Sequence, residues 1–117
     1  MSDFYLYEGE IIRVIDGDSF EIEVQLGFSI SFQVKTRLWH PDGMIDTPEI
    51  RGPEREAGLD SMQYVEAWVE ANAPLTIRTH RDKTGKYGRY LVDIIAADGT
   101  TLSESLLIRG LAEVKPW

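Results

Sequence analysis

Carboxylates stand at two places along the 117-residue chain where their spacing suits chemistry. Asp16 and Asp18 flank a glycine, and Asp46 and Glu49 lie three positions apart on either side of Thr47-Pro48. Proline fixes its own φ and pushes the residue before it into an extended conformation, so this second pair is expected on a stiff, non-helical segment. Such a segment suits carboxylates that bind a metal ion or act as a positioned base.

Each of these features also has an ordinary structural interpretation. The stretch from Asp46 to Glu49 is typical of a helix start, with Asp or Thr as the N-cap and Glu in the first turn. Asp16-Gly17-Asp18 is typical of a tight turn. Arg37 at the end of a strand, considered alone, is expected to be solvated. No single stretch therefore decides the function.

Charge is distributed unevenly along the sequence. The net charge is −8 at pH 7 and the pI is about 4.7, which argues against binding nucleic acid through bulk charge. One segment is nevertheless basic, with Asp82 as its single acid and these cations: Arg78, Arg81, Lys83, Lys86 and Arg89. A basic strip on an acidic body suits a phosphate site, but it is also typical of a solvated hairpin.

Composition predicts one globular domain spanning residues 1–117. Hydrophobic residues make up 43% of the chain and charged residues 27%. The chain has no cysteine, which excludes disulfides and thiolate metal sites. No apolar run approaches the roughly 18 residues of a membrane span. Residues 1–5 carry neither a basic nor an apolar segment, so we expect no signal peptide and a cytoplasmic location.

Alternation of apolar and polar residues predicts three consecutive antiparallel strands over residues 8–14, 19–25 and 30–38. A loop is expected over 39–52, followed by a helix that starts near Pro53 and ends before Pro74. Its buried face is expected to be formed by Leu59, Met62, Val65 and Val69, with Trp68 beside it.

Two further strands are predicted over 75–81 and 90–96, and Ser103 is a candidate cap for a short second helix. Residues 111–114 are candidates to return to the sheet. The fold class is therefore mainly β with helices (α+β). We expect a five-stranded OB-fold Greek-key barrel with one helix between the third and fourth strands and a short helix after the fifth.

The sequence resembles the staphylococcal nuclease (thermonuclease) family. Stretches that match the family occur in its order and cover nearly the whole chain. They are Val14-Ile15-Asp16-Gly17-Asp18-Ser19-Phe20, Arg37-Leu38, Ile45-Asp46-Thr47-Pro48-Glu49, Gly52-Pro53-Glu54, Lys86-Tyr87-Gly88-Arg89 and Gly110-Leu111-Ala112. The resemblance implies the OB fold and calcium-dependent hydrolysis of phosphodiester bonds in DNA and RNA.

The resemblance also implies a role for each matching residue. Asp18 and Asp46 would supply carboxylates to calcium and Thr47 its backbone carbonyl, with Asp16 acting through water. Glu49 is implied as the general base that takes a proton from the attacking water. Two arginines would bind the scissile phosphate and stabilise the transition state, and two further residues would touch a neighbouring phosphate. The arginines are Arg37 and Arg89, and the further pair is Lys86 and Tyr87.

One departure from the family concerns the spacing between Arg37 and Asp46. Nine positions separate them, which is about four more than usual in the family, and the extra residues fall at 40–44. They either bulge outward and leave the site intact or displace Arg37 from it. Neither His40 nor His80 lies at a spacing typical of metal ligands, and the carboxylates suit a harder ion.

Three classes of function remain open at this stage. We expect a monomeric calcium-dependent endonuclease acting on DNA, RNA or both. The main alternative is a non-catalytic OB-fold domain that binds single-stranded nucleic acid or a protein partner. A purely structural module is the third. A binder has no need for Asp18, Asp46 and Glu49, since carboxylates repel phosphate unless a cation is bound.

Overall fold

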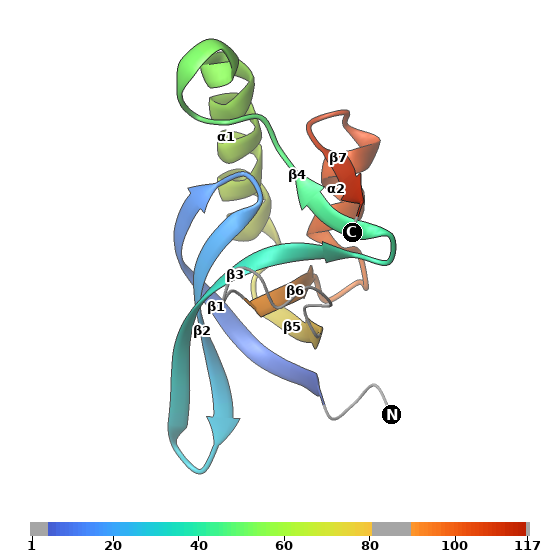
Figure 1. Ribbon diagram of the computed structural model, residues 1–117. Helices are drawn as coiled ribbons and strands as arrows, with labels where there is room; N and C mark the ends of the chain where they lie inside the picture. The colour runs from blue at the N-terminus through green and yellow to red at the C-terminus, as the bar shows by residue number, and fades with distance from the viewer. Residues whose placement is uncertain (1–4, 81–89, 117) are drawn as a thin grey trace.

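The computed structural model describes residues 5–80 and 90–116. Its main body is a five-stranded mixed β-barrel with two helices (Figure 1). The barrel strands are β1 (Leu6–Asp16), β2 (Ser19–Gly27), β3 (Ile30–His40), β5 (Leu75–His80) and β6 (Tyr90–Ile95). The helices are α1 (Arg55–Asn72), which follows the short 3-10 helix η2 (Gly52–Glu54), and α2 (Leu102–Ile108). A small ribbon, β4 (Gly43–Asp46) with β7 (Glu113–Pro116), completes the described elements.

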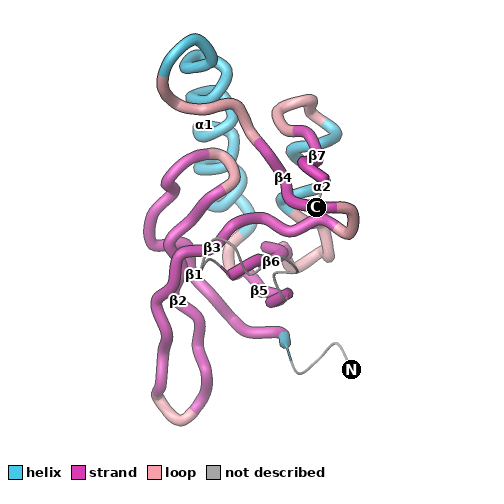
Figure 2. Tube along the Cα trace, in the orientation of Figure 1, coloured by secondary structure: helices cyan, strands magenta, loops and turns pink. Residues whose placement is uncertain are grey.

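Strand pairing closes the barrel. The order is β1-β2-β3-β6-β5, and β5 returns to β1. All neighbours are antiparallel except β3 and β6, which run parallel with Thr36 beside Tyr90. This closure, with α1 between β3 and β5, confirms the OB-type barrel expected from the order of hairpins (Figure 2).

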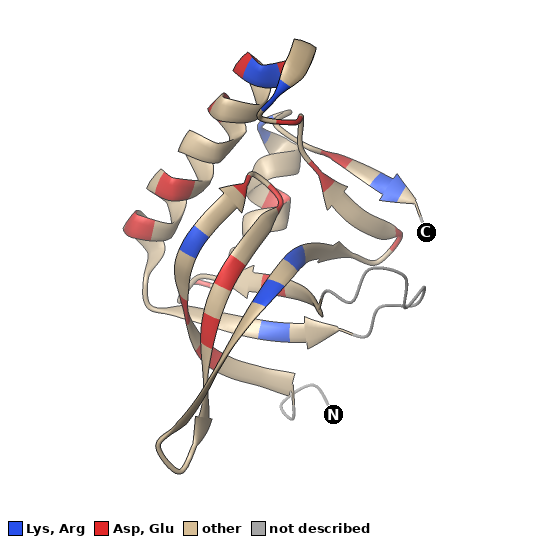
Figure 3. Ribbon diagram, turned by 60° about the vertical axis from the view of Figure 1, so that its left-hand side comes forward, with Lys and Arg blue, Asp and Glu red and all other residues tan. Residues whose placement is uncertain are grey.

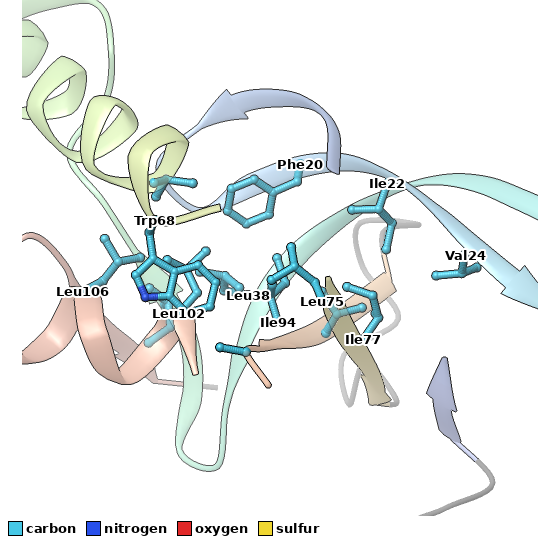
Figure 4. Packing of buried hydrophobic residues seen from close by; sticks show 14 residues of the cluster. Phe20, Ile22, Val24, Leu38, Trp68, Leu75, Ile77, Ile94, Leu102 and Leu106 are labelled. Atoms are coloured by element: carbon cyan, nitrogen blue, oxygen red, sulfur yellow. The ribbon is translucent and has the colours of Figure 1, made fainter. Parts of the chain in front are cut away.

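The core forms where the inner faces of the strands meet the two helices. Phe20, Ile22, Leu38, Ile77 and Ile94 are almost completely buried inside the barrel. Trp68 of α1 lies beside Leu102 and Leu106 of α2 and links the helices to this core (Figure 4). Because β2 and β3 contribute to this core, their outer ends are held in fixed register.

The buried face of α1 differs from the one predicted. Gly58, Ser61, Val65 and Trp68 are buried, whereas Leu59 and Met62 are only half-buried. Small residues occupy this face because the helix lies close to other backbone. A Cβ at Gly58 would collide with the backbone of Glu49 and Ile50, and the Ser61 hydroxyl donates to the Leu111 carbonyl at 2.9 Å. Hydrophobicity alone could not reveal that contact.

Two local predictions were also wrong. The stretch 39–52 is not all loop, because β3 continues to His40 and β4 pairs antiparallel with both β3 and β7. The N-cap of α2 is Thr101 rather than Ser103: its hydroxyl accepts the Glu104 N–H at 3.2 Å. Among the described residues, neither helix is both long and apolar enough to cross a membrane.

Candidate functional site

Among the described residues, four of the predicted site residues lie close together: Asp16, Asp18, Arg37 and Asp46. Asp16 ends β1, Asp18 directly precedes β2, and Arg37 lies in β3 opposite Ser19. The β3–β4 hairpin then brings Asp46, the last residue of β4, back towards Arg37. The residues predicted to be inserted at 40–44 therefore form part of a hairpin, and Arg37 stays beside the acids.

Asp18 is the most enclosed carboxylate of the site. It is 5% exposed and accepts the Thr47 N–H on Oδ2 at 3.0 Å and the Ser19 hydroxyl on Oδ1 at 2.9 Å. Its own N–H donates to Asp16 Oδ1 at 3.0 Å. These bonds fix the Asp18 carboxylate against the start of the Thr47-Pro48 segment, 29 residues further along the chain.

Arg37 lies between the two carboxylates. Its Nη2 is 3.1 Å from Asp46 Oδ1 and 3.5 Å from Asp18 Oδ2, and it reaches the Ile45 carbonyl at 3.5 Å. The Arg37 side chain is 12% exposed, and its Nε is buried without a hydrogen-bond partner. One guanidinium nitrogen thus balances two negative charges, which would otherwise repel each other.

The two carboxylates before β2 differ in their affinity for protons. Burial, a side-chain hydrogen bond with Asp18 and the negative charge of Asp18 together raise the pKa of Asp16 to about 6. Burial acts in the same direction on Asp18. There, however, the hydrogen bonds from Asp16 and Thr47 and the charge of Arg37 outweigh burial and lower the pKa of Asp18. A proton between this pair therefore resides on Asp16.

Thr47 is held close to the Asp16–Asp18 turn. A Cβ at Gly17 would come within 2.8 Å of Thr47 Oγ1 and 3.0 Å of Ser61 Cβ, so this glycine permits close packing. Thr47 is 6% exposed, and its Oγ1 is buried without a hydrogen-bond partner. An unpaired buried oxygen beside two carboxylates is free to accept a further ligand.

Glu49 lies at the edge of an open cleft of about 470 Å³. Asp16 lines the same cleft. Glu49, the general base implied by the resemblance, and Asp16 therefore border one solvent-filled space. The Glu49 side chain is exposed, and its backbone N–H donates to Glu54 Oε2 at 3.3 Å. Arg13 and Arg51 also line this cleft. Neither arginine was identified as part of the site from the sequence. Only Arg51 could have been identified, because it lies two residues after Glu49.

A second polar group that sequence reasoning missed lies at the end of β5. His80 Nε2 is 2.9 Å from Asp93 Oδ2, and its ring stacks on Trp39 with centroids 3.7 Å apart. His80 lies in the basic segment, between Arg78 and Arg81. Its partners come from β3 and β6, so no local spacing could reveal them.

Comparison with known families gives a decisive match. The family model described as staphylococcal nuclease homologue matches residues 43–116, which is more than half of the chain. The chain belongs to the staphylococcal nuclease family. No curated protein matches it at a significant level. This staphylococcal nuclease domain has Asp46, Thr47 and Glu49 inside the matched range, whereas Asp16, Asp18 and Arg37 precede it.

Nucleases of this family use calcium, and the donor atoms that this domain offers are hard oxygens of the kind calcium prefers. Asp18 and Asp46 offer hard carboxylate oxygens, and Thr47 adds a backbone carbonyl and an unpaired hydroxyl. Calcium takes six to eight oxygen ligands, so water and phosphate oxygens would supply the remainder. Within the described part of the chain, no three His, Asp or Glu side chains converge as a ready-made metal cluster. These residues fit calcium if the Arg37 guanidinium moves away from the Asp18 and Asp46 carboxylates, which it contacts in the structure.

Three predicted residues fall outside the described part of the domain. Arg89, Lys86 and Tyr87 belong to the segment 81–89. Their implied roles in binding phosphate stay predictions, as do the roles implied for Asp16, Asp18, Arg37, Asp46, Thr47 and Glu49.

Proposed function

We propose that this staphylococcal nuclease domain hydrolyses phosphodiester bonds of DNA, RNA or both as a calcium-dependent endonuclease. The observation that carries the proposal is the position of Arg37, whose Nη2 lies within 3.5 Å of both Asp18 and Asp46. This arrangement supports a role for the Arg37 guanidinium in binding phosphate next to Asp18 and Asp46 as hard-oxygen ligands. A binding domain gains nothing from two carboxylates at the point where phosphate has to approach.

The chain's own residues would divide the work as follows. Asp18, Asp46 and the Thr47 carbonyl hold calcium, and Asp16 supports this site through water. When bound, calcium supplies positive charge that polarises the phosphate and screens the carboxylates. Arg37 and Arg89 then bind phosphate oxygens through their planar forks and stabilise the charge that develops in the transition state.

Glu49 would act as the base. Its side chain is exposed at the cleft that Asp16 also lines, so water in that cleft has access to the Glu49 carboxylate. Glu49 takes the proton of that water as the oxygen attacks phosphorus, and the leaving oxygen departs on the opposite side. General-base assistance contributes about 10²- to 10⁴-fold to the rate.

The test is single-turnover cleavage of a short single-stranded oligonucleotide under saturating calcium. The wild type should cleave and should stop when calcium is chelated. Glu49→Gln should lower the rate by about 10²-fold or more while leaving calcium and substrate binding nearly unchanged. Glu56→Gln, at an exposed position in the first turn of α1, serves as the matched control.

Three outcomes separate the alternatives. A wild type that binds the oligonucleotide but never cleaves it would replace the nuclease with a nucleic-acid-binding domain. A wild type that neither binds nor cleaves would leave a structural module. Cleavage by Glu49→Gln at the wild-type rate would keep the nuclease and remove Glu49 as its base.

A further inference from the structure

A groove follows β1 on the side of α1. β5 pairs with β1 no further than Gly9, so the rest of β1 has β2 as its only described strand neighbour. Two clefts, of about 660 and about 430 Å³, are lined by residues of both β1 and α1. Because Ile11, Val69 and Glu70 line both clefts, the two adjoin and form one groove, which we call the β1–α1 groove. Residues 8–14 of β1 line it, which corresponds to roughly 20 Å of extended chain.

Apolar side chains form the floor of this groove. Ile11, Val14 and Val69 are half-buried and pack against the barrel core. Ile12 and Pro74 also line the groove, and both are exposed. The floor therefore offers apolar surface that the domain does not cover itself.

A β-bulge presents Ile12 to the groove. The ladder between β1 and β2 passes from Ile11 directly to Arg13, which leaves Ile12 as the extra residue. Its side chain is 45% exposed, so it contributes little to the core. Bulges change the direction of a side chain and are common beside functional sites. We therefore assign this bulge to the surface of the groove.

Unpaired carboxylates line both sides of the groove. Glu8 and Glu10 come from β1, and Glu66 and Glu70 come from α1. All four side chains are exposed, and among the described residues none of them makes a hydrogen bond or an ion pair. Glu66 and Glu70 lie four positions apart, a spacing at which like charges destabilise a helix. Figure 3 shows acidic residues on the last turns of α1 and on the neighbouring strands.

The charge of the groove selects its occupant. Four carboxylates repel nucleic acid and anionic lipid, and a second copy of the chain carries −8 itself. A polyamine would balance the carboxylates but would leave the apolar floor uncovered. We propose that the β1–α1 groove binds an extended segment of a protein partner in which Lys or Arg alternates with apolar residues. Successive side chains of such a segment point to opposite sides, so the apolar ones cover the floor while the long basic ones reach the carboxylates.

The groove leads to the cleft that Glu49 borders. Arg13 and Val14 line both the second cleft of the groove and the cleft of Glu49. Arg13 is positively charged and repels a basic segment, so the binding region is the acidic part of the groove, along residues 8–12 of β1. The partner therefore binds beside the candidate site without occupying it, and its binding requires no calcium.

Isothermal titration calorimetry in the presence of chelator tests the proposal. The probe is a peptide of about seven residues in which Lys and Val alternate, with both ends capped so that only the side chains are charged. The wild type should bind it with a Kd of about 10–100 µM. Spermine, which carries a similar positive charge without apolar side chains, should bind about 10-fold more weakly or not at all.

Two variants separate the carboxylates from the floor. Glu66→Gln with Glu70→Gln should weaken peptide binding by about 3- to 10-fold. Ile12→Thr should weaken it by about 3-fold or more, because part of the apolar contact is lost. These positions are exposed, so both variants should fold, which their melting curves check. Glu56→Gln with Asp60→Asn is the matched control, with the same spacing and charge change at exposed positions of α1 outside the groove, and it should bind like the wild type.

Four results would overturn the proposal. The first is a wild type that does not bind the peptide at concentrations up to about 1 mM. The second is an equal loss of binding in the control variant, which would reduce the effect to net charge. The third is spermine binding as tightly as the peptide, or unchanged binding by Ile12→Thr, since the floor would then have no part. The fourth is a short oligonucleotide that binds the wild type in chelator but not Ile12→Thr, which would make nucleic acid the occupant.

Discussion

Arg37 is the residue on which the state of the metal-free site depends. Its Nη2 contacts the carboxylates of both Asp18 and Asp46, which are also the proposed calcium ligands. A calcium ion and the guanidinium would therefore compete for the same two negative charges. The side chain that stabilises the metal-free site is thus expected to lower its affinity for metal.

Replacing Arg37 by Gln tests this competition. Without calcium, we expect the free energy of unfolding to fall by about 2–4 kcal/mol, since two carboxylates lose their shared counter-ion and one of them is buried. Calcium should then raise the melting temperature of Arg37→Gln more than that of the wild type, because no guanidinium has to be displaced. Melting curves in calcium and in chelator measure both effects.

A matched arginine separates this effect from a general loss of charge. Arg13 pairs with Glu21 at 3.8 Å and is 61% exposed, so Arg13→Gln should change neither the stability nor the calcium response noticeably. Equal calcium shifts in the wild type and Arg37→Gln would show that Arg37 and calcium do not compete.

Asp16 gives the domain a stability that depends on pH. Its folded pKa is raised to about 6, so between about pH 4 and pH 6 the folded state binds a proton that the unfolded state has released. Asp16 therefore stabilises the fold below its unfolded pKa, and this contribution is lost as pH rises through 6. The lowered pKa of Asp18 acts in the opposite direction but below about pH 4.

Asp16→Asn should remove this dependence. In chelator, the difference in unfolding free energy between the variant and the wild type should grow in favour of the variant as pH rises from 4.5 to 7. Urea denaturation at several pH values measures it, with the exposed Asp60→Asn in α1 as control. A difference that does not vary with pH would contradict a protonated Asp16.

At this scale, residue type and spacing predicted which side chains lie together but not how they interact. Asp16, Asp18 and Asp46 lie together as the resemblance implied, and Arg37 joins them although its position had been left open. The shared guanidinium could not be foreseen, because the nine-position gap before Asp46 left the place of Arg37 open. Isolated polar residues whose partners come from other strands, such as the His80–Asp93 pair, carry no sequence signal.

At the scale of elements, the β4–β7 ribbon shows why a short strand escapes prediction. Four residues, Gly43–Asp46, follow a proline turn inside a stretch that resembles a loop. They become a strand because β7, near residue 115, pairs with them and because Gly43 lets the Lys115 backbone approach closely. This pairing fixes Asp46 at the site, so the residues that depart from the family spacing support the carboxylate rather than displace it.

Helix α1 supports Glu49 through Gly58. A Cβ at this position would meet the backbone of Glu49 and Ile50, which cannot move aside as a flexible side chain would. Helix propensity alone predicts that Gly58→Ala gains about 1 kcal/mol. We expect the opposite sign, a loss of about 1–3 kcal/mol from overpacking. Chemical denaturation decides between them, and a stabilised variant would contradict the close contact.

The whole molecule combines a proposed phosphate site with a body whose net negative charge repels phosphate. The order of hairpins was enough to predict the barrel, because consecutive antiparallel strands and one intervening helix leave few ways to close it. The net negative charge of the domain, however, repels the proposed substrate, which is a polyanion. Acidic residues occupy α1 and several barrel strands (Figure 3), and the net charge is −8. Approach of a polyanion should therefore be slow at low ionic strength.

Neutralising acids away from the site tests this view. The exposed residues to change are Glu8 and Glu10 on β1 and Glu66 and Glu70 on α1. Replacing all four by Gln brings the net charge from −8 to −4. We expect kcat/KM for oligonucleotide cleavage to rise about 3- to 10-fold at low salt, with kcat unchanged, since only the encounter improves.

High salt provides the internal check on this last prediction. Screening shortens the reach of charge to about 3 Å at 1 M salt, so the advantage of the four-Gln variant should vanish there. The same four positions changed to Asp keep the charge and should behave like the wild type at every salt concentration. If the gain persists at high salt, or if the Asp variant shows it as well, the substitutions act on the structure of the domain. The acidic body would then have no part in limiting the approach of substrate.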